Sequence, residues 1–324
     1  MNILYLTDDR TDYGMGYYYI DWIKAFQANH HVILWGPGYK DPDPDFFAQV
    51  DLFIIGHGAF DIICDPEYGY FSRKQRLQRF LTRKPSFAYW PAFLDKLNCP
   101  KVFLSKNDYK RNDWKIALYK REKLDLIITH SKEAVDVFRQ AGLRCEWIPF
   151  GVDRDAFKNE GQDRTIDIGF RGNLNGRWNN GLRPALVQAV QDICQDRALD
   201  VVSSQNAENF LFGQAYIDWM NRCHLMINTV SAIGTVGPKW WEQMACGIVP
   251  LAPIADYEGL LEPDVHYVAI KPDLSDLRGQ VDRYFTDTAF QNQLIQNITQ
   301  MAEEAGMDKR LASFETILET HKLI

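Results

Sequence analysis

The 324-residue chain is 46% hydrophobic and 24% charged, a composition typical of soluble globular proteins and a length that suits two α/β domains. No run of about 18 apolar residues occurs, which excludes a transmembrane helix. The six cysteines are scattered singly and form no C-x-x-C pair. We therefore expect a cytoplasmic location without a disulfide framework or a zinc site.

The net charge of −7 is distributed unevenly, because residues 73–123 hold 15 basic and 4 acidic residues. A solvated basic helix, docked on its own sheet through Leu77, Phe80 and Leu81, is the first interpretation. The alternatives are peripheral contact with an anionic membrane, at its inner face, or an acidic binding partner. Nucleic acid is not expected, because no recognised nucleic-acid-binding module accompanies the charge.

The segment Met1–Thr7 lacks the basic residues that begin a signal peptide and is predicted to be the first strand. Gly14 and Gly16 follow it, before a helix expected to begin near Tyr17. The third glycine of a dinucleotide-binding fingerprint would stand at position 19, where the chain has Tyr19. The loop is also too long for that fingerprint, which argues against a nicotinamide cofactor and an oxidoreductase.

Apolar runs alternate with amphipathic segments along the rest of the chain. Most of the runs lack internal alternation, as expected for strands buried on both faces of a parallel sheet. Strands are expected at 3–7, 32–35, 52–55, 102–104, 126–129, 146–149, 166–170, 200–203, 225–228, 248–252 and 266–270. Helices are expected at 18–26, 72–83, 132–141, 182–194, 210–223 and 238–246, with only helices after residue 271. This order predicts an α/β fold with doubly wound parallel sheets and a helical C-terminal tail.

Several polar residues of the first half follow predicted strands or lie in loops. The stretch Asp41–Asp45 contains a D-x-D pattern, but its two prolines predict a rigid surface loop, and no metal is expected there. His57 follows a predicted strand between two glycines and is a candidate catalytic residue, because the ordinary pKa of histidine lies near neutrality. A satisfied structural histidine is the alternative. His130 and Ser131 lack an Asp partner, so no hydrolase triad is predicted, and Ser131 suits a helix N-cap.

Asp108 also follows a predicted strand and is the second catalytic candidate. Its structural alternative is a helix N-cap or a salt bridge to Lys106 or Arg111. The polar stretch Asp153–Thr165 then interrupts the pattern and is predicted to be a linker.

The segment 238–247, PKWWEQMACG, is predicted to be a short helix that faces the crevice at the carboxyl ends of the strands. Pro238 suits the first helical position, and Gly247 suits a left-handed cap. The helix N-terminus and the glycines before it favour an anion. Lys239 is poorly placed for the helix dipole but well placed for phosphate, and the carboxylate of Glu242 can accept hydrogen bonds from ribose hydroxyls.

A structural interpretation of the same segment stays open at this point. A Glu near a helix start is ordinary dipole stabilisation, of about 0.3–1 kcal/mol. Trp240, Trp241 and Met244 are then core residues rather than a stacking platform.

Three stretches, in order, resemble retaining family-4 glycosyltransferases, and more closely their spore-maturation (CgeB-like) branch. In residues 125–157 a strand, Ser131, a helix, Gly142, a strand and the run Pro149-Phe-Gly-Val-Asp153 follow the pattern in which the first domain of that family ends. The run IDIGFRGNLNGRW (166–178) is similar to the strand-turn that opens the second domain. The run WEQMACGIVPLAP (241–253) is similar to the donor motif.

The resemblance implies a GT-B fold, in which two Rossmann-like domains face a central cleft. It implies an acceptor-side domain over 1–152, a nucleotide-sugar-binding domain over 153–305, and a C-terminal helix over 306–324 that packs back toward the first domain. It further implies sugar transfer from a nucleoside diphosphate with retention, without a metal or another cofactor. The leaving phosphate would then deprotonate the acceptor, which is a glycan, a lipid or a small molecule.

The donor-binding residues implied by the resemblance are Gly16, Gly172, Asn173, Arg177, Thr235, Val236, Gly237, Lys239 and Glu242. Arg177 and Lys239 would balance the charge of the diphosphate, and Glu242 would hold the ribose. One departure concerns the sugar: the family carries a second Glu eight residues before Glu242, where this chain has Gly234. The alternatives are therefore a non-catalytic nucleotide-sugar-binding protein and a nucleotide-sugar epimerase on the same scaffold.

Overall fold

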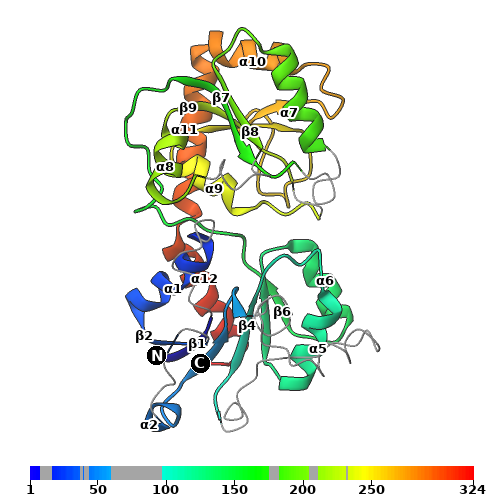
Figure 1. Ribbon diagram of the computed structural model, residues 1–324. Helices are drawn as coiled ribbons and strands as arrows, with labels where there is room; N and C mark the ends of the chain where they lie inside the picture. The colour runs from blue at the N-terminus through cyan, green and yellow to red at the C-terminus, as the bar shows by residue number, and fades with distance from the viewer. Residues whose placement is uncertain are drawn as a thin grey trace, which may run out of the picture. The chain divides into compact units, whose positions relative to one another are not determined.

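The computed structural model describes residues 1–7, 17–36, 39, 44–59, 97–174, 182–203, 211–230 and 233–324. The chain divides into two compact units, Met1–Pro149 with Leu311–Ile324, and Phe150–Arg310. Each unit contains one parallel sheet flanked by helices (Figure 1). The predicted α/β class with parallel sheets and a helical C-terminal region is confirmed.

The sheet of the first unit has the order β2-β1-β3-β4-β5-β6, and all its pairs are parallel. Its strands are β1 (Asn2–Leu6), β2 (His31–Trp35), β3 (Leu52–Ile55), β4 (Lys101–Ser105), β5 (Leu126–Thr129) and β6 (Cys145–Trp147). The described helices of this part of the chain are α1 (Tyr17–Asn29), α2 (Pro44–Phe47), α5 (Asn112–Glu122) and α6 (Lys132–Gln140).

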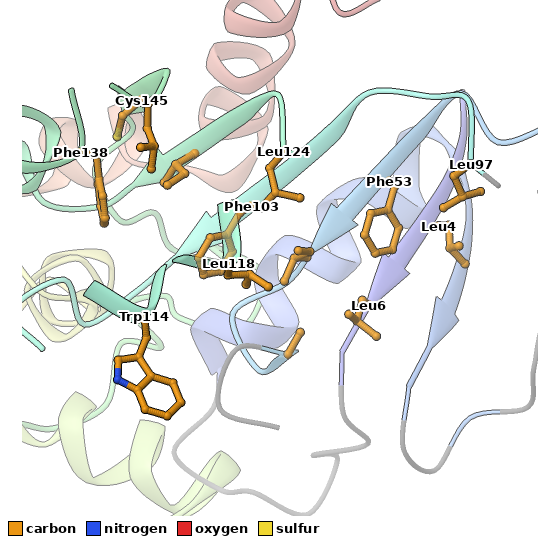
Figure 2. Close-up of a cluster of buried hydrophobic side chains, with 14 of the residues drawn as sticks. Leu4, Leu6, Phe53, Leu97, Phe103, Trp114, Leu118, Leu124, Phe138 and Cys145 are labelled. Carbon is orange, nitrogen blue, oxygen red and sulfur yellow. The ribbon is translucent and has the colours of Figure 1, made fainter. Parts of the chain in front are cut away.

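Apolar side chains on one face of this sheet form a core with α5 and α6 (Figure 2). Leu4, Phe53 and Phe103 contribute from three adjacent strands and are at most 1% exposed. The opposite face is buried as well, which explains why the strand sequences show no alternation. Helix α5 was not predicted from the sequence, because Lys115 stands on its buried face and interrupts the apolar pattern.

The sheet of the second unit has the order β11-β10-β9-β7-β8. Its strands are β7 (Ile166–Gly172), β8 (Leu199–Ser203), β9 (Cys223–Ile227), β10 (Val249–Pro253) and β11 (Val268–Ile270). The helices that follow them are α7 (Leu182–Ile193), α8 (Gly213–Asn221), α9 (Pro238–Ala245), α10 (Leu277–Thr286), α11 (Thr288–Glu304) and α12 (Met307–Thr320). The chain passes from β7 to β8 on one side and then returns to β9 on the other. This reversal makes the carboxyl ends of β7 and β9 the switch point at which such sheets bind ligands.

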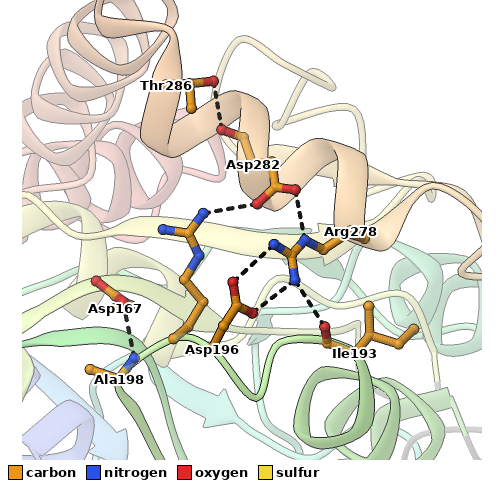
Figure 3. Close-up of polar contacts among 8 residues, drawn as sticks. Asp167, Ile193, Asp196, Ala198, Arg278, Asp282 and Thr286 are labelled. Atoms are coloured by element: carbon orange, nitrogen blue, oxygen red, sulfur yellow. Dashed lines mark hydrogen bonds and ion pairs between the residues drawn. The ribbon is translucent and has the colours of Figure 1, made fainter.

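An arginine network fastens α10 to the end of α7 (Figure 3). The Arg278 guanidinium donates to both carboxylate oxygens of Asp196, at 2.8 and 2.9 Å, and to Asp282 one turn later, at 2.6 Å. It also donates to the Ile193 carbonyl, at 3.3 Å. These groups face solvent, so the network fixes the position of the helix more than it adds stability.

The stretch 153–165, predicted to be a linker, lies within the second unit. Phe157 is fully buried, and Arg164 donates to the Cys223 and Cys246 carbonyls at 3.0 and 3.3 Å. The chain instead crosses between the units after Pro149 and again after Arg310, within α12. None of the described helices combines the length and apolar character needed to cross a bilayer.

The last turns of α12 complete the core of the first unit. The Phe314 ring is fully buried, with centroids 5.1 Å from Phe26 and 5.9 Å from Trp22. Glu315 accepts a hydrogen bond from His30 at 2.8 Å, and His321 bonds Glu146 at 3.0 Å. The end of the chain is therefore a structural part of the first unit.

We expect Phe314→Ala to lower the free energy of unfolding of the first unit by about 3–5 kcal/mol, because it leaves a cavity between α12 and α1. Urea unfolding followed by tryptophan fluorescence measures the change. The matched control is Glu319→Ala on the exposed side of the same helix, which should stay within about 0.5 kcal/mol of the wild type. Equal stability of Phe314→Ala and the control would contradict this role of α12.

Candidate functional site

The second unit brings polar groups together where β7 and β9 end. Gly172 and Asn173 follow β7, and Asn228 and Thr229 follow β9, its parallel neighbour. Helix α9 begins nearby with Gly237 at its N-cap position and Pro238 after it, as the sequence predicts. The candidate site therefore lies at the switch point of the sheet.

Lys239 in the first turn of α9 reaches back to β7. Its Nζ donates to the Arg171 carbonyl and lies 5.8 Å from the centroid of the Phe170 ring. A Cβ atom on Gly172 would lie 3.4 Å from this Nζ and 3.0 Å from Cζ of Phe170. Glycine at position 172 therefore relieves a tight contact with the Phe170 ring, while the ammonium would be in ordinary contact distance.

Arg183, which the sequence analysis did not select, joins the same site from the first turn of α7. Its Nε donates to Thr229 Oγ1 at 2.9 Å, and its Nη1 donates to the Asn173 carbonyl at 3.3 Å. The guanidinium thus bridges the segments that follow β7 and β9. A cation in the first turn of a helix opposes the helix dipole, and this anomaly, which identified Lys239, is also the signal for Arg183.

Burial and charge act together on the two ionisable groups of α9. Burial lowers the pKa of the Lys239 ammonium, and the positive charge of Arg183 lowers it further, while Glu242 acts in the opposite direction. Burial raises the pKa of the Glu242 carboxyl, against the effect of Lys239. Two partly desolvated cations, with a single carboxyl acting on Lys239, form a site that favours an added anion.

The loop before α9 is held by a carboxylate from another loop. Val236 N–H donates to Glu258 Oε2 at 2.9 Å, and the Glu258 side chain is buried. Val236 is among the donor-binding residues that the resemblance implies, but its amide is engaged by Glu258. Gly234 has a φ of +71°, a conformation that a glutamate adopts only with strain. The glutamate that the resembled family carries at this position would therefore be strained in this backbone conformation.

Aromatic side chains support the loop that carries Glu258. The Tyr257 ring lies 4.7 Å from Trp240 of α9 and 5.1 Å from Tyr267, and its hydroxyl donates to the Pro253 carbonyl at 2.6 Å. Trp240, Trp241 and Met244 are at most 1% exposed. The structural interpretation of these three side chains as core residues is confirmed, and Lys239 and Glu242 are the ionisable groups that α9 contributes.

Several predicted features lie outside the described residues. They are Gly16, Arg177, the first part of the D-x-D loop (41–43) and the part of the basic segment over 73–96. Within the residues that the structure does describe, no group of three or more His, Cys, Asp or Glu side chains is arranged to hold a metal ion.

Asp108 of the first unit is enclosed by donors. Its Oδ1 accepts hydrogen bonds from Ser105 Oγ, at 2.5 Å, and from the Lys115 ammonium, and its Oδ2 accepts one from Thr129 Oγ1, at 2.5 Å. Lys115 Nζ also donates to the Lys106 carbonyl at 2.7 Å. Burial alone would raise the pKa of Asp108, but the Lys115 ammonium and the hydroxyl donors hold it below its ordinary value. The predicted salt-bridge partners, Lys106 and Arg111, are therefore wrong, and the partner is Lys115 of α5.

His57 lies just beyond β3 and is 1% exposed. Its Nε2 is 2.7 Å from Nε2 of His130, which follows β5. Ser131 occupies the N-cap position of α6, as predicted, but its side chain makes no capping hydrogen bond. The two catalytic candidates therefore belong to one edge of the sheet, with both side chains buried.

We expect Asp108→Asn to lower the free energy of unfolding by about 3–5 kcal/mol near neutral pH, because it leaves the Lys115 ammonium buried without its counter-charge. The pKa of Asp108 is lowered by folding, so its contribution is present above the ordinary aspartate pKa of about 3.9 and is lost as the pH falls through the folded value. The gap between wild type and variant should therefore close in acid.

Urea unfolding at neutral and acidic pH measures this gap. The matched control is the double variant Asp108→Asn with Lys115→Met, which removes both charges and should recover much of the stability. A gap that is independent of pH, or a double variant less stable than Asp108→Asn, would contradict the ion-pair account.

Comparisons with known proteins agree with this arrangement. Residues 167–316 match the model of a family described as Glycosyl transferase-like. No curated protein matches the chain.

Solved structures with a similar fold cover nearly the whole chain. One is HepE from Anabaena in complex with UDP and glucose, at 15% identity and a TM-score of 0.57, over 98% of this chain and 99% of that one. Another is sucrose-phosphate synthase from Thermosynechococcus elongatus, at 11% identity and a TM-score of 0.57, over 99% and 98%. A third is BGT of phage T4 in complex with UDP and Mn²⁺, at 10% identity and a TM-score of 0.55, over 99% of each chain.

At these identities the likeness concerns the fold, and the predicted GT-B fold is confirmed. The family match covers most of the second unit, which carries the candidate site. Together these findings confirm the enzyme class expected from the sequence, a glycosyltransferase.

Proposed function

We propose that the protein transfers a sugar from a nucleoside-diphosphate donor to an acceptor and binds the donor where β7 and β9 end. The observation that carries the proposal is the cluster of Arg183 and Lys239 beside Glu242 at the start of α9. Two cations at the switch point of a Rossmann-like sheet suit a diphosphate.

Each residue of the site has a role in this proposal. Lys239 and Arg183 neutralise the charge that grows on the departing diphosphate, which is usually the largest catalytic contribution in such transfers. Glu242 accepts hydrogen bonds from the ribose hydroxyls. Gly172, Asn173 and the amides of Thr235 and Gly237 line the phosphate position. Arg177 adds a further positive charge and Gly16 a close backbone approach, both as the resemblance implies.

UDP is the first donor nucleotide to test, because HepE and BGT, which share the fold, are described as complexes with UDP. We further propose retention of configuration, with the leaving phosphate as the base, on the strength of the resemblance to the family-4 and CgeB-like enzymes. The assignment of the first domain, 1–152, to the acceptor and of 153–305 to the donor rests on the same resemblance. So does the proposal that the C-terminal helix 306–324 packs back toward the first domain.

The acceptor, the membrane contact and the metal requirement are proposals of the same kind. We propose a glycan, lipid or small-molecule acceptor, a cytoplasmic location with peripheral membrane contact through the basic segment 73–123, and catalysis without a metal. Because BGT is described as a complex with Mn²⁺, catalysis without a metal should be tested directly by adding EDTA.

Of the two catalytic candidates in the first unit, we retain His57 as catalytic and assign Asp108 to stability, because both of its oxygens already accept hydrogen bonds.

A non-catalytic nucleotide-sugar-binding protein is the second candidate function, favoured by Gly234 in place of the usual Glu. Release of UDP from UDP-glucose distinguishes a transferase from a binding protein. Only a transferase moves the glucose to an added acceptor or to water and so releases UDP. An epimerase would convert the sugar and release no UDP.

We expect UDP to stabilise the wild-type protein against heat, by mass action on the folded state. Lys239→Ala and Arg183→Ala should each raise the Kd for UDP roughly 10- to 100-fold, because each removes a charge-assisted hydrogen bond of about 1.5–3 kcal/mol. Isothermal titration calorimetry measures the Kd. The control is Lys271→Ala, an exposed lysine of the same unit. If neither UDP, GDP, ADP nor dTDP raises the Tm, the donor site is wrongly assigned.

The affinity for UDP should fall as the pH rises through the mildly alkaline range, well before the ordinary lysine value of 10.5 is reached. Burial and Arg183 lower the pKa of Lys239 in the free protein, whereas a bound diphosphate raises it, so binding takes up a proton. Calorimetry in buffers of increasing pH detects both the loss of affinity and the proton uptake. In Lys239→Arg the alkaline dependence should disappear, since a guanidinium stays charged. The same slope in both proteins would exclude Lys239 as its source.

A further inference from the structure

Two buried histidines in the first unit are not used by the donor site. His57 follows β3 and His130 follows β5, and their side chains are 1% and 2% exposed. Their rings meet edge to face, with centroids 4.8 Å apart. The pair stands at the carboxyl edge of the sheet, where a Rossmann-like unit presents its functional groups.

A chain of two hydrogen bonds runs through these rings. His130 Nδ1 lies 2.6 Å from the Ile148 carbonyl oxygen, and His130 Nε2 lies 2.7 Å from His57 Nε2. Both distances are those of hydrogen bonds, so each of the two atom pairs along the chain consists of one donor and one acceptor.

The carbonyl at one end determines where the protons are. A carbonyl oxygen only accepts, so His130 Nδ1 carries a hydrogen and donates it to Ile148. In a neutral imidazole the other nitrogen is then an acceptor, so His130 Nε2 accepts from His57 Nε2–H. Neutral His57 must consequently carry its hydrogen on Nε2 and keep a lone pair on Nδ1.

The position of His130 is fixed by its neighbours in sequence. Thr129 Oγ1 donates to Asp108 Oδ2, at 2.5 Å, and accepts from Ser131 N–H, at 3.1 Å. Ile148 N–H donates to the Thr129 carbonyl at 3.0 Å, which sets the Ile148 carbonyl beside His130. The Asp108 cluster therefore holds the strand end from which His130 reaches His57.

The end of β3 is fixed as well. A Cβ atom on Gly56 would lie only 2.3 Å from Cε1 of Tyr5, so glycine is required for the strand to pass this close to the ring. His57 is thereby placed within reach of His130.

We infer that His130 is a positioning residue that fixes neutral His57 as the Nε2–H tautomer, with the lone pair of His57 on Nδ1. The tautomer follows from the geometry alone, while its catalytic use rests on the proposed function.

Nitrogen NMR of ¹⁵N-labelled wild-type protein tests the tautomer without any ligand, since protonated and unprotonated ring nitrogens have distinct chemical shifts. The spectrum is expected to show His57 with hydrogen on Nε2 and His130 with hydrogen on Nδ1. His57→Gln and His130→Gln assign the signals. A wild-type His57 that carries its hydrogen on Nδ1 overturns the inference.

Two variants test the influence of His130 on His57. In His130→Phe the acceptor is gone, and the His57 signals should become those of a tautomer mixture. His130→Gln, whose amide oxygen can accept from His57 Nε2–H, should keep the Nε2–H tautomer. His31→Phe, at an exposed histidine, is the control and should leave His57 unchanged. An unchanged His57 tautomer in His130→Phe overturns the inference.

UDP release from UDP-glucose tests the catalytic use. His130→Phe should lower kcat about tenfold or more, as expected when an acid–base group is wrongly oriented. The Kd for UDP should stay unchanged within about twofold, because the donor cluster belongs to the other unit. Loss of the tautomer without loss of kcat overturns the catalytic part. If the wild type neither binds UDP nor releases it, the proposed function fails, and the NMR result stands by itself.

Discussion

Two positive charges, Arg183 and Lys239, are held close together at the end of β7, and the chemistry of the second unit depends on this constraint. Each is partly removed from water, and each lies where a helix dipole disfavours it. Carbonyl oxygens of Arg171 and Asn173 and the carboxyl of Glu242 offset only part of this cost. An anion that enters the site relieves both the repulsion and the unfavourable dipole, so the fold favours binding before any specific contact to a sugar is considered.

The first unit handles buried charge in the opposite way. Asp108 and Lys115 neutralise each other, and hydroxyl groups complete the coordination of the carboxylate. The charges of this cluster are balanced without a ligand, and its hydrogen bonds join the ends of β4 and β5. A buried ion pair adds little stability over apolar residues but is costly to break, which suits a clamp whose purpose is to keep a histidine in one place.

The fold could be read from the sequence because its strands are short, apolar and regularly separated, and the helix start at Pro238 revealed Lys239 and Glu242. The rest depended on contacts between distant segments. Arg183 becomes part of the site only because α7 begins beside Thr229, and Glu258 reaches Val236 from a loop that follows the next strand. Lys115 was missed for a different reason: a lysine on the buried face of α5 conceals the helix that carries it. Contacts between distant segments depend on the topology of the sheet, and the periodicity of apolar residues in the sequence does not reveal that topology.

The assignment of Leu311–Ile324 to the first unit also bears on how the protein is made. During synthesis, residues 1–149 emerge before the helix that carries Phe314, and all of 150–310 emerges between them. The first unit is therefore completed only after the second, and its apolar surface around Trp22 and Phe26 lacks its cover until residues 311–324 have emerged. Nascent chains stalled before residue 311 are the species that most need protection from aggregation.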